Sequence, residues 1–423
     1  MARPNVTVVI DDQSFVIPGT EAGSATRAGM PSVYGLILAL GYTAERKSGI
    51  MQVENPGEWL ERLTSTEPTG SGDWTDNPDH VSSGIDGSGT TGARWPYGPT
   101  GAWKNEWWAV HNYLQYGGVA VVGATGTEEN TEDPDAADGV VSNAYATLKN
   151  KSLPLDCVFA ATGGSGYITQ ISNIATTRGD CVAVLPALDD SNDLSLDAGT
   201  VNRAGSADEF NITVFGAKKH LDVTRGINDA ENEANYITTS VAADVAGCIA
   251  RTDRDAAPWF SPAGFRRGRI LDVVRLVDNP TDAQMDSMYD SKINPVVTFP
   301  GEGTVLFGDK TGAASTSTLS RINVSRLFIH LKKTIGAAAR SILFEMNDIT
   351  TRASFVNAVT PVLDSIRARR GLYDYRVVCD TTNNTQDIID SNQFVADVFL
   401  KPAKSINFIK ITFTNKNTTD NLD

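Results

Sequence analysis

The sequence contains few of the residues from which catalytic and metal sites are built. Only four cysteines and four histidines occur among its 423 residues. The cysteines form no Cys-x-x-Cys pair and have no histidine at ligand spacing, so we expect buried free thiols. The histidines are too scattered for a Ser-His-Asp or Cys-His arrangement. We therefore predict a protein that is not an enzyme and that holds no cofactor or metal.

Positive charge is also scarce. Lys and Arg number 36 against 51 Asp and Glu, which gives a net charge of −15 and an isoelectric point near 4.8. Proteins that bind nucleic acid present basic faces to the phosphates, so this balance argues against a nucleic-acid partner. No apolar run approaches the ~18 residues of a membrane span, and the start at Met1–Asn5 lacks an apolar secretory core. We expect synthesis in a cytoplasm and no membrane insertion.

Two glycine-containing stretches imitate nucleotide-binding loops without meeting their requirements. Gly123-Ala124-Thr125-Gly126 follows a Val-rich run, but Glu129 stands where the next glycine is needed, in an acidic run that would repel phosphate. We interpret this stretch as a strand-to-loop turn. In Gly303–Thr311, Asp309 separates the glycine from the lysine, and residues 304–307 are typical of a strand. We expect no nucleotide at either place.

From residue 106 the sequence alternates between helical and strand patterns. Arg178-Gly179-Asp180 is interpreted as a turn between a helix and the next strand. Such alternation predicts a mixed α/β fold with a largely parallel sheet flanked by helices. The expected helices cover residues 106–116, 138–150 and 167–177, and the expected strands cover residues 119–122, 157–160 and 182–185.

The last third of the chain continues with amphipathic helices followed by strands. One helix is expected just before Arg251, and a capping box at Thr281 opens another through Tyr289. Pro361 lies inside a later helical pattern and predicts a kink or an early end. The remaining expected helices cover residues 324–335 and 355–366, and the expected strands cover residues 375–379, 394–400 and 407–413.

Both ends of the chain contain β-prone segments, which we expect to form extended β-strand arms. In the C-terminal segment, apolar side chains fall on both faces of the strand, which implies burial on both sides. Exposed strand edges invite another chain to pair with them. The residues predicted to make such inter-subunit pairs are Val6, Val8, Ile10, Phe408, Ile409, Ile411 and Phe413.

Two clusters of arginines stand out in this acidic chain. They are formed by Arg266, Arg267 and Arg269, and by Arg367, Arg369 and Arg370. One interpretation is a solvated face, and the other is electrostatic docking against the acidic surface of a neighbouring subunit or another protein. Residues 64–105 are rich in Gly, Ser and Thr but also contain tryptophans, so we expect an ordered excursion that docks on a neighbour or on its own domain.

Several phrases occur in a fixed order in the last part of the chain. Together they resemble the conserved part of contractile phage tail sheath proteins, over roughly residues 110–415. None of them is a catalytic motif. The phrases are Ala250-Arg251-Thr252-Asp253, Pro258-Trp259-Phe260-Ser261-Pro262-Ala263-Gly264, Ile293-Asn294-Pro295, Phe299-Pro300-Gly301-Glu302-Gly303, Arg321-Ile322-Asn323-Val324-Ser325-Arg326-Leu327-Phe328, Tyr373-Asp374-Tyr375-Arg376-Val377-Val378-Cys379-Asp380 and Asn383-Asn384-Thr385.

The resemblance implies a structural role in a virion tail. Sheath subunits stack as six-fold rings in a helical homo-polymer around a tail tube protein, with baseplate and tail terminator proteins as further partners. Their terminal arms add strands to a neighbour's sheet, and contraction drives the tube through the host envelope to deliver the genome. Assembly would take place in the host cytoplasm. The alternative is the sheath of a phage-derived contractile injection system or bacteriocin.

The resemblance also suggests a division of the chain, which is shorter than many sheath proteins. We expect an N-terminal arm over residues 1–25, an N-terminal part of the core over 26–105, and an α/β sheath core over 106–270. A conserved C-terminal domain then covers residues 271–400, and a C-terminal arm covers residues 401–423.

Overall fold

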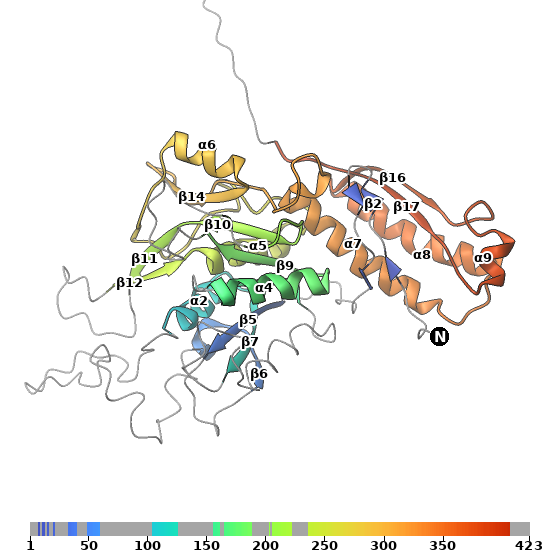
Figure 1. Ribbon diagram of the computed structural model, residues 1–423, viewed down its shortest axis with the longest axis horizontal. Coiled ribbons are helices and arrows are strands. Elements are labelled where there is room, and N and C mark those ends of the chain that lie inside the picture. The colour runs from blue at the N-terminus through green and yellow to red at the C-terminus, as the bar shows by residue number, and fades with distance from the viewer. Residues whose placement is uncertain are drawn as a thin grey trace, which may run out of the picture.

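The structure centres on an eight-stranded mixed sheet (Figure 1). It is a computed structural model that describes residues 7–8, 11–12, 15–16, 20–21, 33–39, 49–59, 104–125, 155–160, 165–187, 203, 205–221 and 236–406. The strand order is β15-β14-β10-β9-β8-β5-β7-β6. Neighbours from β14 through β7 are parallel, whereas the edge strands β15 and β6 are antiparallel to theirs. The strands are β5 (Val33–Ala39), β6 (Gly49–Val53), β7 (Val119–Thr125), β8 (Cys157–Phe159), β9 (Val182–Pro186), β10 (Asn211–Phe215), β14 (Ile293–Phe299) and β15 (Gly303–Leu306).

The central strands are buried on both faces by helices. Every residue of β8, β9 and β10 is buried, and the sequences of β8 and β9 accordingly contain no polar residues. Helix α4 (Ser165–Arg178) covers one face, and α2 (Lys104–Leu114) and α5 (Ala242–Asp255) pack against each other on the opposite face (Figure 1). We call this layered unit the sheet core. The sequence prediction of a largely parallel sheet flanked by helices is confirmed.

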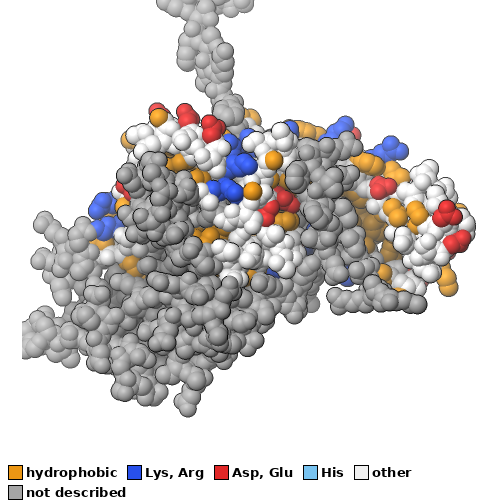
Figure 2. Space-filling view, in the orientation of Figure 1, with side chains coloured by type: hydrophobic (Ala, Val, Ile, Leu, Met, Phe, Trp, Pro, Cys, Tyr) orange, Lys and Arg blue, Asp and Glu red, His pale blue; other side chains and the backbone are white. Residues whose placement is uncertain are grey.

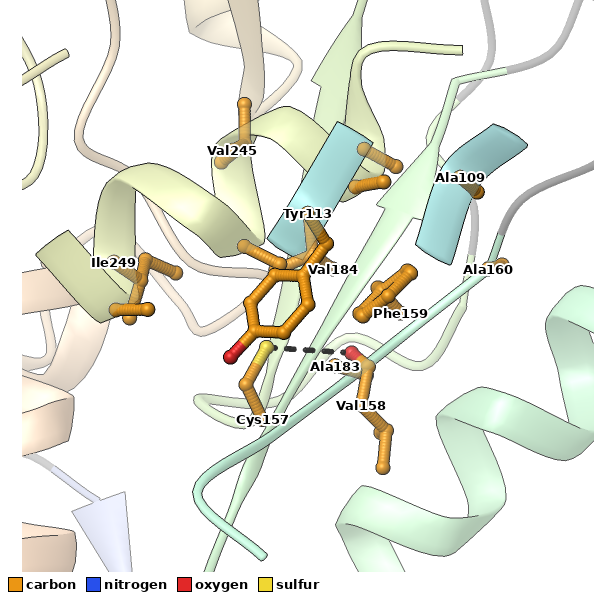
Figure 3. Close-up of a cluster of buried hydrophobic side chains, with 14 of the residues drawn as sticks. Ala109, Tyr113, Cys157, Val158, Phe159, Ala160, Ala183, Val184, Val245 and Ile249 are labelled. Atoms are coloured by element: carbon orange, nitrogen blue, oxygen red, sulfur yellow. Dashed lines mark hydrogen bonds between the residues drawn. The ribbon is translucent and has the colours of Figure 1, made fainter. Parts of the chain in front are cut away.

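Aromatic and aliphatic side chains from distant segments meet inside the sheet core. Figure 3 shows Tyr113 of α2 beside Phe159 of β8, with Val245 and Ile249 of α5 nearby. The Tyr113 and Phe159 rings lie 5.4 Å apart between centroids. Close approach of α2 and α5 depends on Gly247, because a Cβ at this position would lie only 2.4 Å from the Tyr116 ring. The core is therefore built from residues separated by more than a hundred positions.

A second, smaller core lies beside the sheet and is formed by the C-terminal part of the chain. Helix α8 (Ile349–Ala368) packs on a two-stranded antiparallel sheet of β16 (Leu372–Val378) and β17 (Asp397–Pro402), and helix α7 (Ile322–Ser341) packs against α8. We call this unit the C-terminal core. Its buried apolar residues form a cluster separate from that of the sheet core, centred on Leu327, Phe355 and Leu363.

Shorter elements complete the described chain. A three-stranded antiparallel sheet, in the order β12-β11-β13, packs against α2. The N-terminal strands pair locally, β1 with β4 and β2 with β3. The bounds are β1 (Thr7–Val8), β2 (Asp11–Asp12), β3 (Phe15–Val16), β4 (Thr20–Glu21), β11 (Ala217–Leu221), β12 (Tyr236–Ser240), β13 (Arg275–Leu276), α6 (Asp282–Asp290), η4 (Thr318–Ser320) and α9 (Gln386–Asp390).

Two helix predictions differ from the structure in detail. The helix expected over residues 106–116 is α2, which runs from Lys104 to Leu114, and every residue from 107 to 114 is buried, because α5 and β12 cover the side that faces away from the sheet. The Pro361 pattern predicted a kink or an early end, yet α8 continues to Ala368. Pro361 and Asn357, whose carbonyl loses its helical donor, are both exposed, so water can satisfy that carbonyl.

Two strand predictions also differ. The Gly123–Thr125 stretch, expected to be a turn, still belongs to β7, because Gly123 and Ala124 pair with both β5 and β6. The strand expected from Phe394 begins at Asp397, since the Val395 amide donates to the Asn384 side chain and not to β16. The helix at 138–150, the tryptophans of the 64–105 region and the strand at 407–413 lie outside the described residues.

Candidate assembly surfaces and the junction between the cores

The Ala-Arg-Thr-Asp phrase at the end of α5 holds the loop that leads to the C-terminal core. Arg251 Nη2 donates to the carbonyls of Arg267 and Arg269, the latter at 2.8 Å. Its guanidinium also lies over the Tyr116 ring, 5.2 Å from the centroid. The planar guanidinium thus binds two carbonyls of one loop and stacks on a ring at the same time. A lysine ammonium has no planar group and could not make the same set of contacts.

Buried ion pairs join α7 to the sheet core. Arg326 Nη2 lies 2.5 Å from Asp253 Oδ2 at the end of α5, and these side chains are only 5% and 11% exposed. Lys333 Nζ lies 2.6 Å from Asp156 Oδ1, just before β8. Burial alone would raise the pKa of Asp156, but the Lys333 ammonium outweighs it and holds that pKa below its usual value. Breaking a buried pair leaves an uncompensated charge, so these contacts resist separation of the two cores.

The Arg178-Gly179-Asp180 turn belongs to the same junction. Arg178 and Asp180 form a buried ion pair of 2.8 Å with side chains 0% and 3% exposed. Gly179 has a positive φ of 60°, and its carbonyl accepts a hydrogen bond from Lys332 Nζ of α7. The prediction of a structural turn between helix and strand is confirmed, because this tripeptide is buried.

Two further sequence motifs contribute side chains that hydrogen-bond to distant backbone segments, the amide of Asn294 and the indole of Trp259. Asn294 Nδ2 donates to the carbonyls of Thr213 and Lys310, and its Oδ1 accepts from the Lys310 amide at 2.7 Å. Trp259 Nε1 donates to the carbonyl of Arg369, 3.1 Å away at the end of α8. These side chains therefore connect segments that are far apart in sequence. Buried polar groups need hydrogen-bond partners, and these two find them on distant parts of the chain.

The root of the C-terminal segment is held by three elements. The Ala403 amide donates to the carbonyl of Gly371, and Asn323 Nδ2 of α7 lies 3.4 Å from the carbonyl of Ala403. Ser405 Oγ donates to Asp309 Oδ2 over 2.7 Å. Burial raises the pKa of Asp309 to about 6. Residues 403–405 are therefore held in a fixed position next to β16.

Most residues of the β16–β17 hairpin are exposed or half-buried. Among the described residues its sheet has two strands, so the outer edge of each is unpaired there. Tyr373 is 69% exposed and Phe399 is 56% exposed. Asn384 fixes the connection between the strands, because its Nδ2 donates to the carbonyl of Val395 at 2.7 Å and its Oδ1 accepts from the Val395 amide. A preformed hairpin with open edges is suited to accept strands from other chains.

Three of the six predicted docking arginines make intramolecular contacts. Arg267 Nε donates to the carbonyl of Ser261 at 2.6 Å. Arg369 stacks on Trp259 and donates to the carbonyl of Ala256. Arg367 pairs with Asp364 at the surface, with both side chains about half exposed.

The other three arginines, Arg266, Arg269 and Arg370, are exposed, and no ion pair to a described residue holds their guanidinium groups. Docking by the two arginine clusters remains a prediction. Of the predicted arm residues, only Val8 lies within the described chain, in β1, so strand exchange by the arms is also still a prediction.

The described residues bear on two kinds of site, a metal site and a reactive thiol. Within the described ranges, no group of three or more His, Cys, Asp and Glu side chains could hold a metal ion. All four cysteines are buried free thiols, and burial raises the pKa of Cys181 and of Cys248 to about 12. Such thiols are poor nucleophiles. In the same ranges, none of the helices combines the length and the apolar character that crossing a membrane requires.

Sequence comparisons place these features in a known context. The model of the phage tail sheath protein central domain matches residues 168–312, and that of the phage tail sheath C-terminal domain matches residues 314–416. The chain is 51% identical over 178 residues to the tail sheath protein of Vibrio phage KVP40 and 44% identical over 211 residues to that of Enterobacteria phage T4. The aligned segments cover 42% and 50% of this chain but only 26% and 32% of those proteins, so the chain spans a third or less of these curated relatives.

Solved structures match the fold over nearly the whole chain. The helical sheath of the anti-feeding prophage in the contracted state has a TM-score of 0.62 and covers 98% of this chain and 100% of that one, at 17% identity. The contracted PVC sheath complex of an extracellular contractile injection system has a TM-score of 0.61 with 98% coverage of both chains, also at 17% identity. A chain of the anti-feeding prophage baseplate has a TM-score of 0.64 at 15% identity. At these identities the likeness is one of fold.

Proposed function

Because the chain belongs to the phage tail sheath family, we propose that it is the subunit of a contractile tail sheath. In this proposal it polymerises as stacked six-fold rings around the tail tube and contracts to drive the tube through the host envelope. The observation that carries the proposal is the agreement of two family models over adjacent halves of the conserved region. The fold shared with two contracted sheaths supports it.

The β16–β17 hairpin is the surface that we assign to strand exchange. Its open edges and exposed Tyr373 and Phe399 favour pairing with strands from neighbouring subunits. The donors would be the terminal segments with Val6, Val8 and Ile10 at one end and Phe408, Ile409, Ile411 and Phe413 at the other. Ala403 and Ser405, which precede the C-terminal donor residues in the sequence, are held by hydrogen bonds to Gly371 and Asp309.

Contraction in this proposal is movement between subunits that remain internally rigid. The buried pairs Arg326–Asp253 and Lys333–Asp156 hold the two cores together within one subunit. Free energy stored in the extended lattice would be released when rigid subunits repack while their arms stay threaded. No nucleotide enters this mechanism, because the energy comes from the difference between two lattices.

The partners follow from the same proposal. They are further copies of this chain, a tail tube protein, baseplate proteins and a tail terminator, with the assembled sheath part of the virion and built in the host cytoplasm. The sheath of a phage-derived injection system is the second candidate, supported by the fold shared with the anti-feeding prophage and PVC sheaths. Sequence identity of 41–51% to phage tail sheath proteins favours the phage particle.

Negative-stain microscopy of the purified chain tests the proposal. We expect wide hollow tubes that resemble contracted sheath, because the contracted lattice should have the lower free energy. Light scattering should rise with protein concentration above a threshold, as it does for a helical polymer. A protein that stays monomeric at high concentration in both measurements would contradict the proposal.

A further inference from the structure

Three phenylalanines form an exposed aromatic patch next to the β14–β15 hairpin. Phe265 and Phe307 are 48% and 45% exposed, and the half-buried Phe299 lies between them. The ring centroids are 5.3 Å apart for Phe265 and Phe299 and 5.1 Å apart for Phe299 and Phe307. Isolated exposed phenylalanines are ordinary, but three in mutual contact form an apolar surface of the kind found in protein interfaces.

The loop that carries Phe265 is rigid. Its backbone runs along β15, because the Leu306 amide donates to the carbonyl of Gly268 and the Ile270 amide donates to the carbonyl of Thr304. Gly264 adopts a positive φ of 84° at the start of the turn, and its amide donates to the carbonyl of Leu306. The patch is therefore held in place before any partner arrives, which lowers the entropy lost on binding.

Two exposed arginines stand beside the aromatic patch. Arg266 directly follows Phe265, and the Arg269 guanidinium lies about 4 Å from the place where a Cβ on Gly303 of β15 would stand. The adjacent Arg267 is tied to its own loop and packs on the Phe260 ring. Arg266 and Arg269 thus give the apolar surface a basic edge, and an acidic partner would complement it.

Helix α6 of the same chain presents an acidic stripe. Asp282 and Asp286 are exposed and four residues apart, so they lie on one side of the helix. A capping box of Thr281 and Gln284 holds the first turn in place. Within the described ranges neither aspartate pairs with a cation. Figure 2 shows acidic side chains gathered over α6.

We propose that the aromatic patch of one subunit, with Arg266 and Arg269 at its edge, docks on the acidic stripe of α6 of a second copy of this chain. The partner is a second copy of this chain because the charges are complementary. The same chain presents both the patch with its basic edge and the acidic stripe. A contact of this kind joins two different surfaces, and when it is not made reciprocally between the same two subunits it propagates into an open helical array. The inference rests on the proposed polymerisation and assigns two surfaces to it.

Charge reversal on each side tests the contact in the full-length chain. Arg266→Glu/Arg269→Glu places like charges opposite Asp282 and Asp286, and Asp282→Arg/Asp286→Arg does the same from the other side. Each double variant should raise the critical concentration for tube formation by more than about tenfold. The quadruple variant and an equimolar mixture of the two double variants should both restore tubes, because each then pairs opposite charges again.

Two controls keep the test specific. Glu54→Arg reverses the charge of an exposed residue just after β6, outside the C-terminal core and both proposed surfaces, and it should leave the critical concentration unchanged. Phe265→Ser/Phe307→Ser should weaken assembly in a way that no charge reversal rescues. Circular dichroism and thermal melting of each variant below the critical concentration verify that the subunit is folded.

The outcomes separate this inference from the proposed function. If the original chain forms no tubes under any condition, the proposed function fails. If the original chain forms tubes and both reversals assemble equally well, or if neither the quadruple variant nor the mixture restores assembly, the contact assigned here is wrong and the function stands. If the Arg266→Glu/Arg269→Glu variant forms normal tubes that do not take up purified tail tube protein, the patch binds the tail tube. That result would overturn the docking on α6.

Discussion

The sheet core and the C-terminal core complete their packing to different degrees. In the sheet core, β8 and β9 are buried at every position and helices cover both faces. In the C-terminal core, β17 alternates between exposed and half-buried residues, and Tyr373 and Phe399 face solvent. Since strand edges and apolar side chains are stabilised by pairing and burial, the first unit is complete in one chain and the second is suited to completion by neighbours.

Exposed apolar residues are distributed in the same unequal way. The turn between α7 and α8 exposes Phe344, Met346 and Ile349 at 84%, 79% and 75%. Phe344 also adopts a positive φ of 72°, which costs free energy for a residue with a Cβ. On the side of the sheet core, the large apolar side chains Phe265, Val274, Val277 and Phe307 are also exposed, but each less so, at 39–57%. The comparison predicts that changes to the C-terminal surfaces affect assembly, while changes at the junction affect folding.

Deletion of residues 1–20 should have the largest effect on assembly and almost none on the fold of the subunit. The arm is proposed to pair with a neighbour, whereas the sheet core is already covered by its own helices. We expect loss of long tubes in negative stain and a melting temperature close to that of the full chain. A truncated protein that forms normal tubes, or that does not fold, would rule out arm exchange.

Asp253→Ala should give the largest loss of subunit stability. It leaves Arg326 buried without its partner, and breaking such a pair costs about 3–5 kcal/mol. We expect the free energy of unfolding in urea to fall by this amount, with the two cores separating into distinct transitions. Arg326→Met with Asp253→Leu removes both charges and should recover much of the loss. A change below about 1 kcal/mol for Asp253→Ala would show that the junction is not held by this pair.

Acid should destabilise the sheet core through His111. Burial lowers the pKa of His111 to about 4. The unfolded chain therefore binds the proton first, so the stabilisation is complete above pH 6.5 and is lost as the pH falls toward 4. The loss should reach about 3 kcal/mol, from 1.36 kcal/mol per pKa unit. His111→Gln should flatten the pH dependence of the unfolding free energy between pH 6.5 and 4, and an unchanged slope would contradict the assignment.

Asp309 should act in the opposite direction at the root of the C-terminal segment. Burial raises its pKa to about 6, above the value in an unfolded chain. The folded state therefore gains relative stability as the pH falls from 6 toward 4, because the folded chain takes up the proton first. We expect the protection factors of the amides in residues 400–406, which correct each exchange rate for the intrinsic rate at the same pH, to rise as the pH falls over this range in the original chain. Asp309→Asn should abolish that pH dependence, and a variant that keeps it would assign the effect to another group.

Removal of the surface pair Asp364–Arg367 should have the smallest effect. Both side chains are about half exposed, so solvent screens the interaction. Asp364→Ala is expected to change the free energy of unfolding by less than about 1 kcal/mol. The difference between the unfolding free energies lost in Asp253→Ala and in Asp364→Ala, measured in the same urea titration, shows how much burial adds to the cost of breaking an ion pair. A cost equal to that of Asp253→Ala would remove the distinction between junction and surface.

The local patterns of the sequence determined much of the fold. Apolar runs without polar alternation gave β8 and β9, and the capping box at Thr281 placed the start of α6 correctly. These signals succeed because helix periodicity, caps and strand burial depend on residues within a few positions of each other. The ordered phrases of the last third likewise indicated the tail sheath family, which the family models support.

The roles of the residues inside those phrases were decided by the tertiary structure. Nothing in the local sequence pairs Asp253 with Arg326, or directs Asn294 to the carbonyl of Thr213, because the partners are 73 and 81 positions apart. The same holds for Arg369, which stacks on Trp259 although the two residues are 110 positions apart. A buried charge or amide must find its partner wherever the chain crosses, and that crossing depends on the packing of whole helices and strands.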